Sequence, residues 1–172
     1  IEISPKKFGV KHMDGNQLIC SNHYQSDTYR NDSNNIKNIA QSDSKYRFDR
    51  MQTLINDHKQ IDASTSASLL RDQMSVDNDT LGMGNPRAIN QLLAHHSVVI
   101  KPANSLLYVS AKPYQLGKYS GLNLEKSVMQ RKLIYDDYIA PDPFLYSNGY
   151  LQFSFFKSIR QEISKFLWGR IK

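Results

Sequence analysis

Asn22 and Arg47 are the two side chains whose type and position could serve chemistry in this sequence. Asn22 follows a predicted strand that ends at Ser21, and a strand end is a place where a rigid scaffold can present an amide to a ligand. Arg47 falls in the first turn of a predicted helix, where a cation opposes the positive end of the helix dipole. An amide N–H can stabilise an oxyanion and a guanidinium can bind an anion, so the two residues indicate a candidate polar site.

Both residues also have plain structural explanations. An Asn in this position often caps a turn. An ion pair with Asp43 or Asp49 would account for Arg47 as well as an anionic ligand would. If Asn22 and Arg47 serve one site, the polar segment Gln25–Ser44 must fold back so that the two side chains meet.

Other candidate motifs are weaker. His95 and His96 are adjacent and would point to opposite faces of a strand, so they cannot bind one metal together. The Gly82–Gly84 segment lacks the Lys and Ser or Thr of a phosphate loop and is predicted to be a turn. The single cysteine, Cys20, excludes an intrachain disulfide and a cysteine-based zinc site, and we expect it to be a small buried apolar side chain. We therefore predict no metal and no cofactor.

Short strands are expected at the start of the chain. Asp14 and Gly15 are a strong hairpin signal between two of these strands. Apolar residues point to both faces of the second arm, so the sheet should be covered on both sides. The predicted strands are Ile1–Ile3, Phe8–Met13 and Asn16–Ser21.

Helices and a second hairpin should follow. The polar composition of Gln25–Ser44 predicts a loop, after which apolar spacing predicts a helix capped by Ser44. A second helix should run from its cap Asp62 to about Met74, and Asp77–Arg87 should be a loop. Two strands, Ser97–Lys101 and Leu106–Ala111, flank a turn of hairpin length, and the four strong strands should form an antiparallel sheet.

The end of the chain predicts an amphipathic helix over residues 150–172. Its basic residues lie mostly on the polar face, and we expect the apolar face to dock on the same domain rather than on a membrane. The apolar face comprises Phe155, Ile159, Ile163, Phe166 and Leu167.

Composition is that of a globular protein. The 172 residues are 40% apolar and 22% charged, which predicts a single domain over residues 1–172 with an α+β fold. Much of the net charge of +6 lies in Tyr150–Lys172, and the aromatic residues are not interleaved with basic ones, so a nucleic-acid partner is not expected. No run approaches the roughly 20 apolar residues of a membrane span.

Several short segments, in this order, resemble the choloylglycine hydrolases and the isopenicillin N acyltransferase-like branch of the linear amide hydrolases. Cys20–Tyr24 resembles their Thr-Asn-His/Asn element, and Ser42–Phe48 resembles their Ser-x-x-Arg-Phe/Leu element. The other segments that resemble the acyltransferase-like branch are Glu2–Pro5, Leu69–Asp72, His96–Pro102 and Leu106–Pro113.

This resemblance implies an αββα sandwich of two antiparallel sheets between helical layers. In that family, autoproteolysis exposes an N-terminal Cys that attacks an amide, and this Cys precedes the segments found here. The chain would be the C-terminal part of such an enzyme, without its nucleophile. Asn22 would donate to the oxyanion and Arg47 would orient the thiolate, with an N-acyl amino acid, a bile-salt conjugate or a penicillin-type amide as substrate.

Two kinds of protein remain open. The first is this enzyme part, inactive alone, whose partners are a small-molecule amide substrate and the missing N-terminal half of the same protein. The second is a non-catalytic scaffold or assembly module that never had a nucleophile. In the first case, the sheet edges that should meet the missing half are exposed, so the chain should form a homo-oligomer or aggregate unless that half is supplied.

Overall fold

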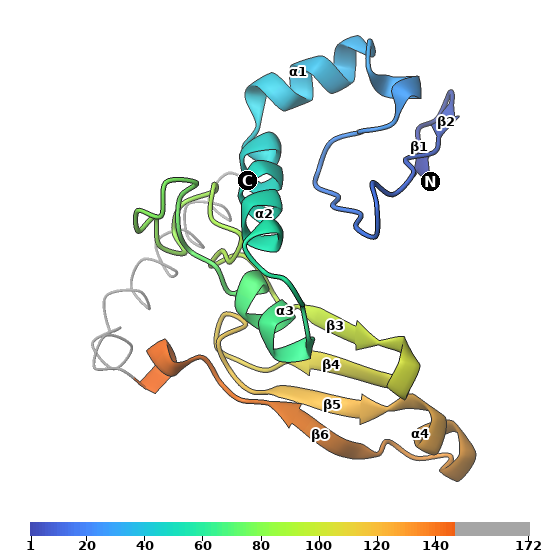
Figure 1. The fold of residues 1–172 in the computed structure, drawn as a ribbon, viewed down its shortest axis with the longest axis vertical. Helices are drawn as coiled ribbons and strands as arrows, with labels where there is room; N and C mark the ends of the chain where they lie inside the picture. Colours follow the sequence, from blue (N-terminus) through green and yellow to red (C-terminus); the bar gives the residue numbers. More distant parts are fainter. Residues whose placement is uncertain (147–172) are drawn as a thin grey trace, which may run out of the picture. The chain divides into compact units, whose positions relative to one another are not determined.

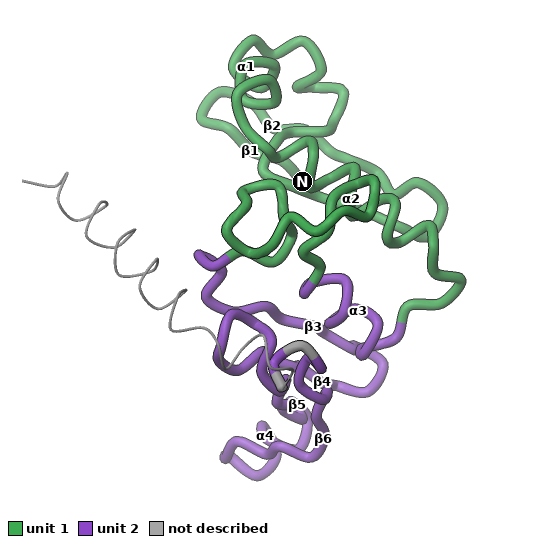
Figure 2. Tube along the Cα trace, turned by 90° about the vertical axis from the view of Figure 1, so that its left-hand side faces the viewer, with its two compact units in different colours: residues 1–61, 72–91 green, residues 62–71, 92–172 purple. Residues whose placement is uncertain are grey.

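The computed structural model describes residues 1–146, which form an α+β fold of helices and two antiparallel sheets (Figure 1). The chain forms two compact units. Unit 1 comprises residues 1–61 and 72–91, and unit 2 comprises residues 62–71 and those from 92 onward (Figure 2). The single domain expected over residues 1–172 stays a prediction.

Unit 1 begins with a two-stranded sheet in which β1 (Glu2–Ile3) pairs antiparallel with β2 (Phe8–Gly9). The predicted turn at Gly15 is confirmed, since Asp14 and Gln17 exchange backbone hydrogen bonds and Gly15 has a φ of 62°. The predicted strand after this turn is wrong. An isolated hairpin is marginal without a third strand, and this segment has none, so the chain around Cys20 is irregular and Cys20 is exposed rather than buried.

The polar segment predicted as a loop instead contains the short 3₁₀ helix η1 (Asp27–Tyr29) and the helix α1 (Ser33–Gln41). The reason is local capping rather than apolar periodicity. The Asp32 carboxylate accepts the backbone N–H groups of Asn34 and Asn35, which satisfies two donors that a helix start leaves free.

The next helix, α2 (Ser44–Asn56), begins where the sequence predicts, but Ser44 is not its cap. Asp43 holds the capping position without a side-chain hydrogen bond, and the Ser44 side chain points to other partners described below. Arg50 of this helix is buried and forms two hydrogen bonds with the Asp72 carboxylate, at 2.9 and 2.7 Å. This ion pair anchors the start of the segment 72–91 to α2. The segment contains no helix or strand, so the predicted loop over Asp77–Arg87 is confirmed.

Unit 2 begins with α3 (Ala63–Leu70). The predicted cap is confirmed, because the Asp62 carboxylate accepts the Thr65 N–H at 2.7 Å. The helix ends four residues before the predicted Met74. At its end the buried Arg71 guanidinium donates to backbone carbonyls of the same unit, among them that of Gly117 at 2.8 Å.

The main sheet of unit 2 has the strand order β3-β4-β5-β6, and all neighbours are antiparallel (Figure 1). The predicted hairpin is confirmed as β3 (Val98–Lys101) and β4 (Leu106–Ser110), joined by the 3₁₀ turn η2 (Pro102–Asn104). This hairpin does not pair with the N-terminal strands, which corrects the predicted four-stranded arrangement. Its partners are elements that the sequence analysis missed: β5 (Tyr119–Asn123), α4 (Leu124–Gln130) and β6 (Tyr135–Ile139).

The core of unit 2 lies between α3 and one face of this sheet. Ala67 of the helix packs on the sheet, and Ala63 and Leu70 lie beside it. The buried sheet residues of this core are Val99, Tyr108, Tyr119 and Ile139. Hence α3 covers one face of the sheet.

The description ends with the 3₁₀ helix η3 (Pro143–Tyr146), so the amphipathic helix predicted for residues 150–172 lies outside the described residues. Among the helices that are described, none is long and apolar enough to cross a bilayer.

Candidate functional site

Asn22 and Arg47 lie in contact in unit 1. The Arg47 Nη2 donates a hydrogen bond to Asn22 Oδ1 at 2.9 Å, and its Nη1 donates to the Pro86 carbonyl at 2.7 Å. The expectation that the polar segment folds back and brings the two side chains together is therefore confirmed. Asn22 does not end a strand, as predicted, but lies in an irregular segment that runs against the start of α2.

The ion-pair explanation for Arg47 is wrong. Asp43 pairs with Arg87 at 3.3 Å and Asp49 pairs with Lys45 at 2.5 Å. The two acceptors of Arg47 are a carbonyl and an amide oxygen, both neutral. Arg47 thus places a positive charge beside Asn22, and no carboxylate forms a hydrogen bond with Arg47 to neutralise that charge.

The hydrogen bonds of Asn22 orient its side-chain amide. Its Oδ1 is taken by Arg47, and its backbone carbonyl accepts the Asn38 Nδ2 at 2.8 Å. Within the described part of the chain, the Nδ2 of Asn22 has no acceptor, and the residue is exposed. This leaves two N–H donors available to a ligand from a side chain that Arg47 holds in place.

The residues that flank Asn22 are fixed to the first residue of α2. Ser21 Oγ lies 2.9 Å from the Ser44 carbonyl and 3.0 Å from Ser44 Oγ, and His23 Nδ1 lies 2.8 Å from Ser44 Oγ. Burial and the nearby Lys45 ammonium lower the pKa of His23, so its neutral form is favoured. Although Ser44 and His23 form a hydroxyl–imidazole pair, Ser44 is fully buried and cannot attack a ligand.

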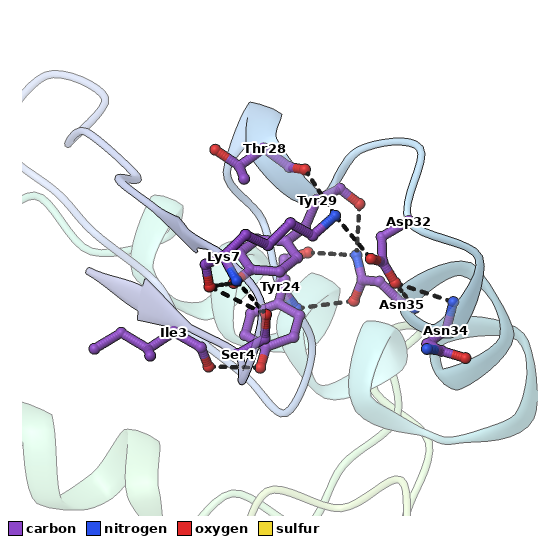
Figure 3. A network of polar contacts seen from close by, with 9 residues as sticks. All are labelled: Ile3, Ser4, Lys7, Tyr24, Thr28, Tyr29, Asp32, Asn34 and Asn35. Carbon is purple, nitrogen blue, oxygen red and sulfur yellow. Dashed lines mark hydrogen bonds and ion pairs between the residues drawn. The ribbon is translucent and has the colours of Figure 1, made fainter.

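Tyr24 anchors the other side of this segment (Figure 3). Its ring stacks on that of the buried Tyr29, with centroids 3.9 Å apart, and its hydroxyl donates to the Ile3 carbonyl at 2.8 Å. The Asn35 side chain of α1 accepts the Tyr24 N–H and donates to the Tyr24 carbonyl, each at 3.0 Å. The backbone after Asn22 is therefore held by a helix, a strand and an aromatic stack.

Glu2 of β1 is a further positioning residue. Its carboxylate accepts the backbone N–H groups of Gln25 at 2.7 Å and Ser26 at 2.9 Å. Burial raises the pKa of Glu2, but the hydrogen bonds from Ser26 and Gln25 outweigh it, so the pKa is lowered and the carboxylate stays ionised. Lys7 adds an ion pair to Asp32 at 2.8 Å (Figure 3).

Glu2, His23 and Ser44 are parts of this site that were not predicted from the sequence. Glu2 and His23 belong to two of the segments that carry the family resemblance, and this was the one signal that could have found them. Ser44 was recognised only as a helix start. The sequence gives no sign that its hydroxyl binds Ser21 and His23.

A cavity of about 1090 Å³ adjoins Asn22 in unit 1. Cys20 also lines this cavity, but the structure shows no base within hydrogen-bond reach of its thiol among residues 1–146. No group of three metal-binding side chains occurs in the described residues either. The cavity is lined by Ile1–Lys7, Cys20–Tyr24, Tyr29, Asp32, Asn34, Asn35 and Asn38.

Comparison of the chain with protein-family models, with curated proteins and with solved structures finds no match. The geometry around Asn22 and the resemblance of the short segments that form it are therefore the two indications of function.

Proposed function

We propose that this chain is the C-terminal part of a cysteine-nucleophile amidohydrolase or acyltransferase of the choloylglycine hydrolase and isopenicillin N acyltransferase-like group. Its complete fold would be the αββα sandwich of that group, and its substrates would be linear amides. The nucleophile would lie in the N-terminal part of the same protein. Autoproteolysis there would expose this nucleophile as an N-terminal Cys.

The observation that carries this proposal is the hydrogen bond from Arg47 to Asn22 Oδ1. An amide held by its oxygen can only donate with its nitrogen. The resemblance assigns the two residues to one site, and they lie in contact although 24 residues separate them along the chain.

The chemistry that this geometry supports is acyl transfer. The thiolate attacks the amide carbon, the carbonyl becomes an oxyanion, and Asn22 Nδ2 donates a hydrogen bond to it. When the tetrahedral intermediate collapses, the C–N bond breaks, the amine leaves with a proton, and a thioester remains for water or a second amine to attack. Arg47 fixes the donor and adds positive charge where negative charge develops.

The test is made on the full-length enzyme with Asn22→Ala. We expect kcat and kcat/KM to fall together by about 10²- to 10³-fold, because the contact is made mainly in the transition state. Asn56→Ala, which changes an exposed Asn at the end of α2, is the matched control and should leave both constants unchanged. Equal constants for Asn22→Ala and the unmodified enzyme would contradict the assignment.

The non-catalytic scaffold is the second candidate. The chain's only thiol, Cys20, lacks an adjacent base among the described residues, so no activated nucleophile is present there, as both candidates require. The reading frame upstream of Ile1 separates the two. A Cys-initiated strand about 150 residues upstream, an ordinary domain length, supports the enzyme, and a start close to Ile1 supports the scaffold.

A further inference from the structure

His23 lines the cavity beside Asn22, and two contacts hold its ring. Its Nδ1 lies 2.8 Å from the Oγ of the buried Ser44, and its ring meets the Phe48 ring edge-on, with centroids 5.7 Å apart. The other ring nitrogen, Nε2, forms no hydrogen bond within the described residues and is not buried. The fold therefore leaves one nitrogen of His23 available to a ligand in the cavity.

The tautomer of His23 follows from the hydroxyl hydrogens around Ser44. Ser21 Oγ lies 2.9 Å from the Ser44 carbonyl, which can only accept, so the Ser21 hydrogen is used there. The contact between the two hydroxyl oxygens, at 3.0 Å, must then use the Ser44 hydrogen. No hydroxyl hydrogen remains for His23 Nδ1, so the hydrogen-bond network assigns the ring hydrogen to Nδ1, which donates it to Ser44 Oγ.

This tautomer gives the cavity a hydrogen-bond acceptor. A neutral imidazole with its hydrogen on Nδ1 has a lone pair on Nε2. The ring stays neutral near neutral pH, because burial and the Lys45 ammonium lower the pKa of His23 more than the Glu2 and Asp49 carboxylates raise it. His23 Nε2 is therefore a base, whereas the preceding residue, Asn22, offers the Nδ2 donor.

A donor and an acceptor on adjacent residues suit the second half of the proposed reaction. After the first amine has left, water or another amine must attack the thioester, and it loses a proton as it does so. The thioester oxygen needs a hydrogen-bond donor in this step, and the attacking molecule needs a proton acceptor. Asn22 Nδ2 and His23 Nε2 supply one of each.

We propose that His23 Nε2 is the general base of this second half and takes a proton from the attacking water or amine. The inference rests on the proposed function. As the attacking atom bonds to the carbonyl carbon, its proton moves to Nε2, and the carbonyl electron pair moves to the oxygen that Asn22 binds. Collapse then breaks the C–S bond, and the imidazolium returns the proton to the departing thiolate. The base that activates the thiol in the first half is a separate group.

The experiment uses the full-length enzyme with His23→Gln, because glutamine can still bond to Ser44 but cannot take up a proton. We expect kcat to fall about 10²-fold or more with kcat/KM unchanged, because the first half of the reaction does not use His23. The thioester should accumulate, and mass spectrometry of the intact protein should detect the added acyl group. The matched control is His58→Gln, since His58 Nδ1 is also bonded, 2.7 Å from the Leu54 carbonyl oxygen, but the residue lies outside the cavity.

Added imidazole separates a lost base from a disturbed fold. His23→Ala leaves a space that imidazole can enter, so we expect imidazole to raise kcat in proportion to its concentration and to remove the accumulated thioester. A purely structural role of His23 predicts no such recovery.

Three results would overturn the inference: an unchanged kcat in His23→Gln, an equal fall of kcat and kcat/KM without accumulated thioester, or no response of His23→Ala to imidazole. Each of these leaves the proposed function intact, because the unmodified enzyme still cleaves the amide. An unmodified full-length protein that does not cleave amides contradicts the proposed function itself.

Discussion

At the scale of the residue, Asn22 shows how a flexible side chain becomes a fixed donor. Its amide oxygen is bound by Arg47, its carbonyl by Asn38, and the next residue but one, Tyr24, is held by Asn35. Each hydrogen bond reduces the conformations open to the segment, so less order must be created when a ligand arrives. A site of this kind depends on the positioning residues as much as on the donor itself.

Arg47→Lys tests this dependence in the full-length enzyme. A lysine keeps the charge, but it lacks the planar fork that lets Arg47 donate to Asn22 and Pro86 together. Losing a hydrogen bond from a charged group costs about 1.5–3 kcal/mol, so we expect kcat to fall about ten-fold or more. Arg30→Lys, at a 74% exposed side chain that pairs with Asp27, is the control, and an equal loss in both variants would argue against a positioning role.

A pH effect on stability should come from His23. Its folded-state pKa is lowered, so the neutral ring stabilises the folded protein above the ordinary pKa of about 6.5, and this contribution is lost as the pH falls through the folded-state pKa. Urea unfolding of the 172-residue chain between pH 7.5 and 4.5 measures the effect. The pH dependence should be smaller for His23→Gln than for His58→Gln, and identical curves would contradict the prediction.

At the scale of the element, the sheet of unit 2 depends on a close approach at Gly121. A Cβ placed there would lie 2.9 Å from the Asp137 carbonyl oxygen and 2.9 Å from the Tyr108 ring, and both neighbours are held within the sheet and its core. The absence of a side chain at Gly121 therefore leaves room for the Tyr108 ring against β5.

We expect Gly121→Ala to lower the free energy of unfolding by about 1–3 kcal/mol, the usual effect of forcing an extra group into a packed core. Denaturant unfolding of the chain measures it. The control is Gly84→Ala, because a Cβ at Gly84 meets nothing within 4 Å and its φ is unremarkable. If Gly121→Ala and the control have the same free energy of unfolding, the prediction is wrong and the sheet can shift to accommodate a Cβ at this position.

Elements with a strong local signal could be predicted from the sequence. Asp62 as a cap, the β3–β4 hairpin and the start of α2 at Ser44 were found because each follows from neighbouring residues. The failures had two causes. The helix α1 has a local cap, Asp32, but little apolar spacing that would reveal it, and its Asn35 binds Tyr24. The strand β5 contains Ser120 and Gly121, which look unlike strand residues until β4 and β6 pair with them.

The candidate site shows the same division. Asn22 and Arg47 were named from the sequence, and their contact was expected only on the condition that they share a site. Their true surroundings were not foreseen, because the acceptor Pro86 lies 39 residues from Arg47 and the carboxylate of Glu2 lies 23 residues from Gln25. Spacing along the chain carries no information about such pairs.

At the scale of the whole molecule, the 172-residue chain should have no amidase activity by itself. Nucleophilic catalysis needs an activated thiol and its base, and the proposed enzyme holds these in its N-terminal part. Release of amine from N-acyl amino acids and from a penicillin, measured with and without the co-expressed N-terminal part, checks this. Turnover by the isolated chain that stops when Cys20 is alkylated would contradict the proposal that the nucleophile lies in the N-terminal part.

The division into two units also has a consequence for synthesis on the ribosome. Neither unit is a continuous stretch of sequence, since residues 62–71 belong with those from 92 onward. The helix α3 therefore leaves the exit tunnel long before the strands that it covers, and its apolar residues must wait until β6 has been made. During that interval Ala67 and Leu70 are exposed on the nascent chain, and exposed apolar surface of this kind makes a partly folded chain prone to aggregate.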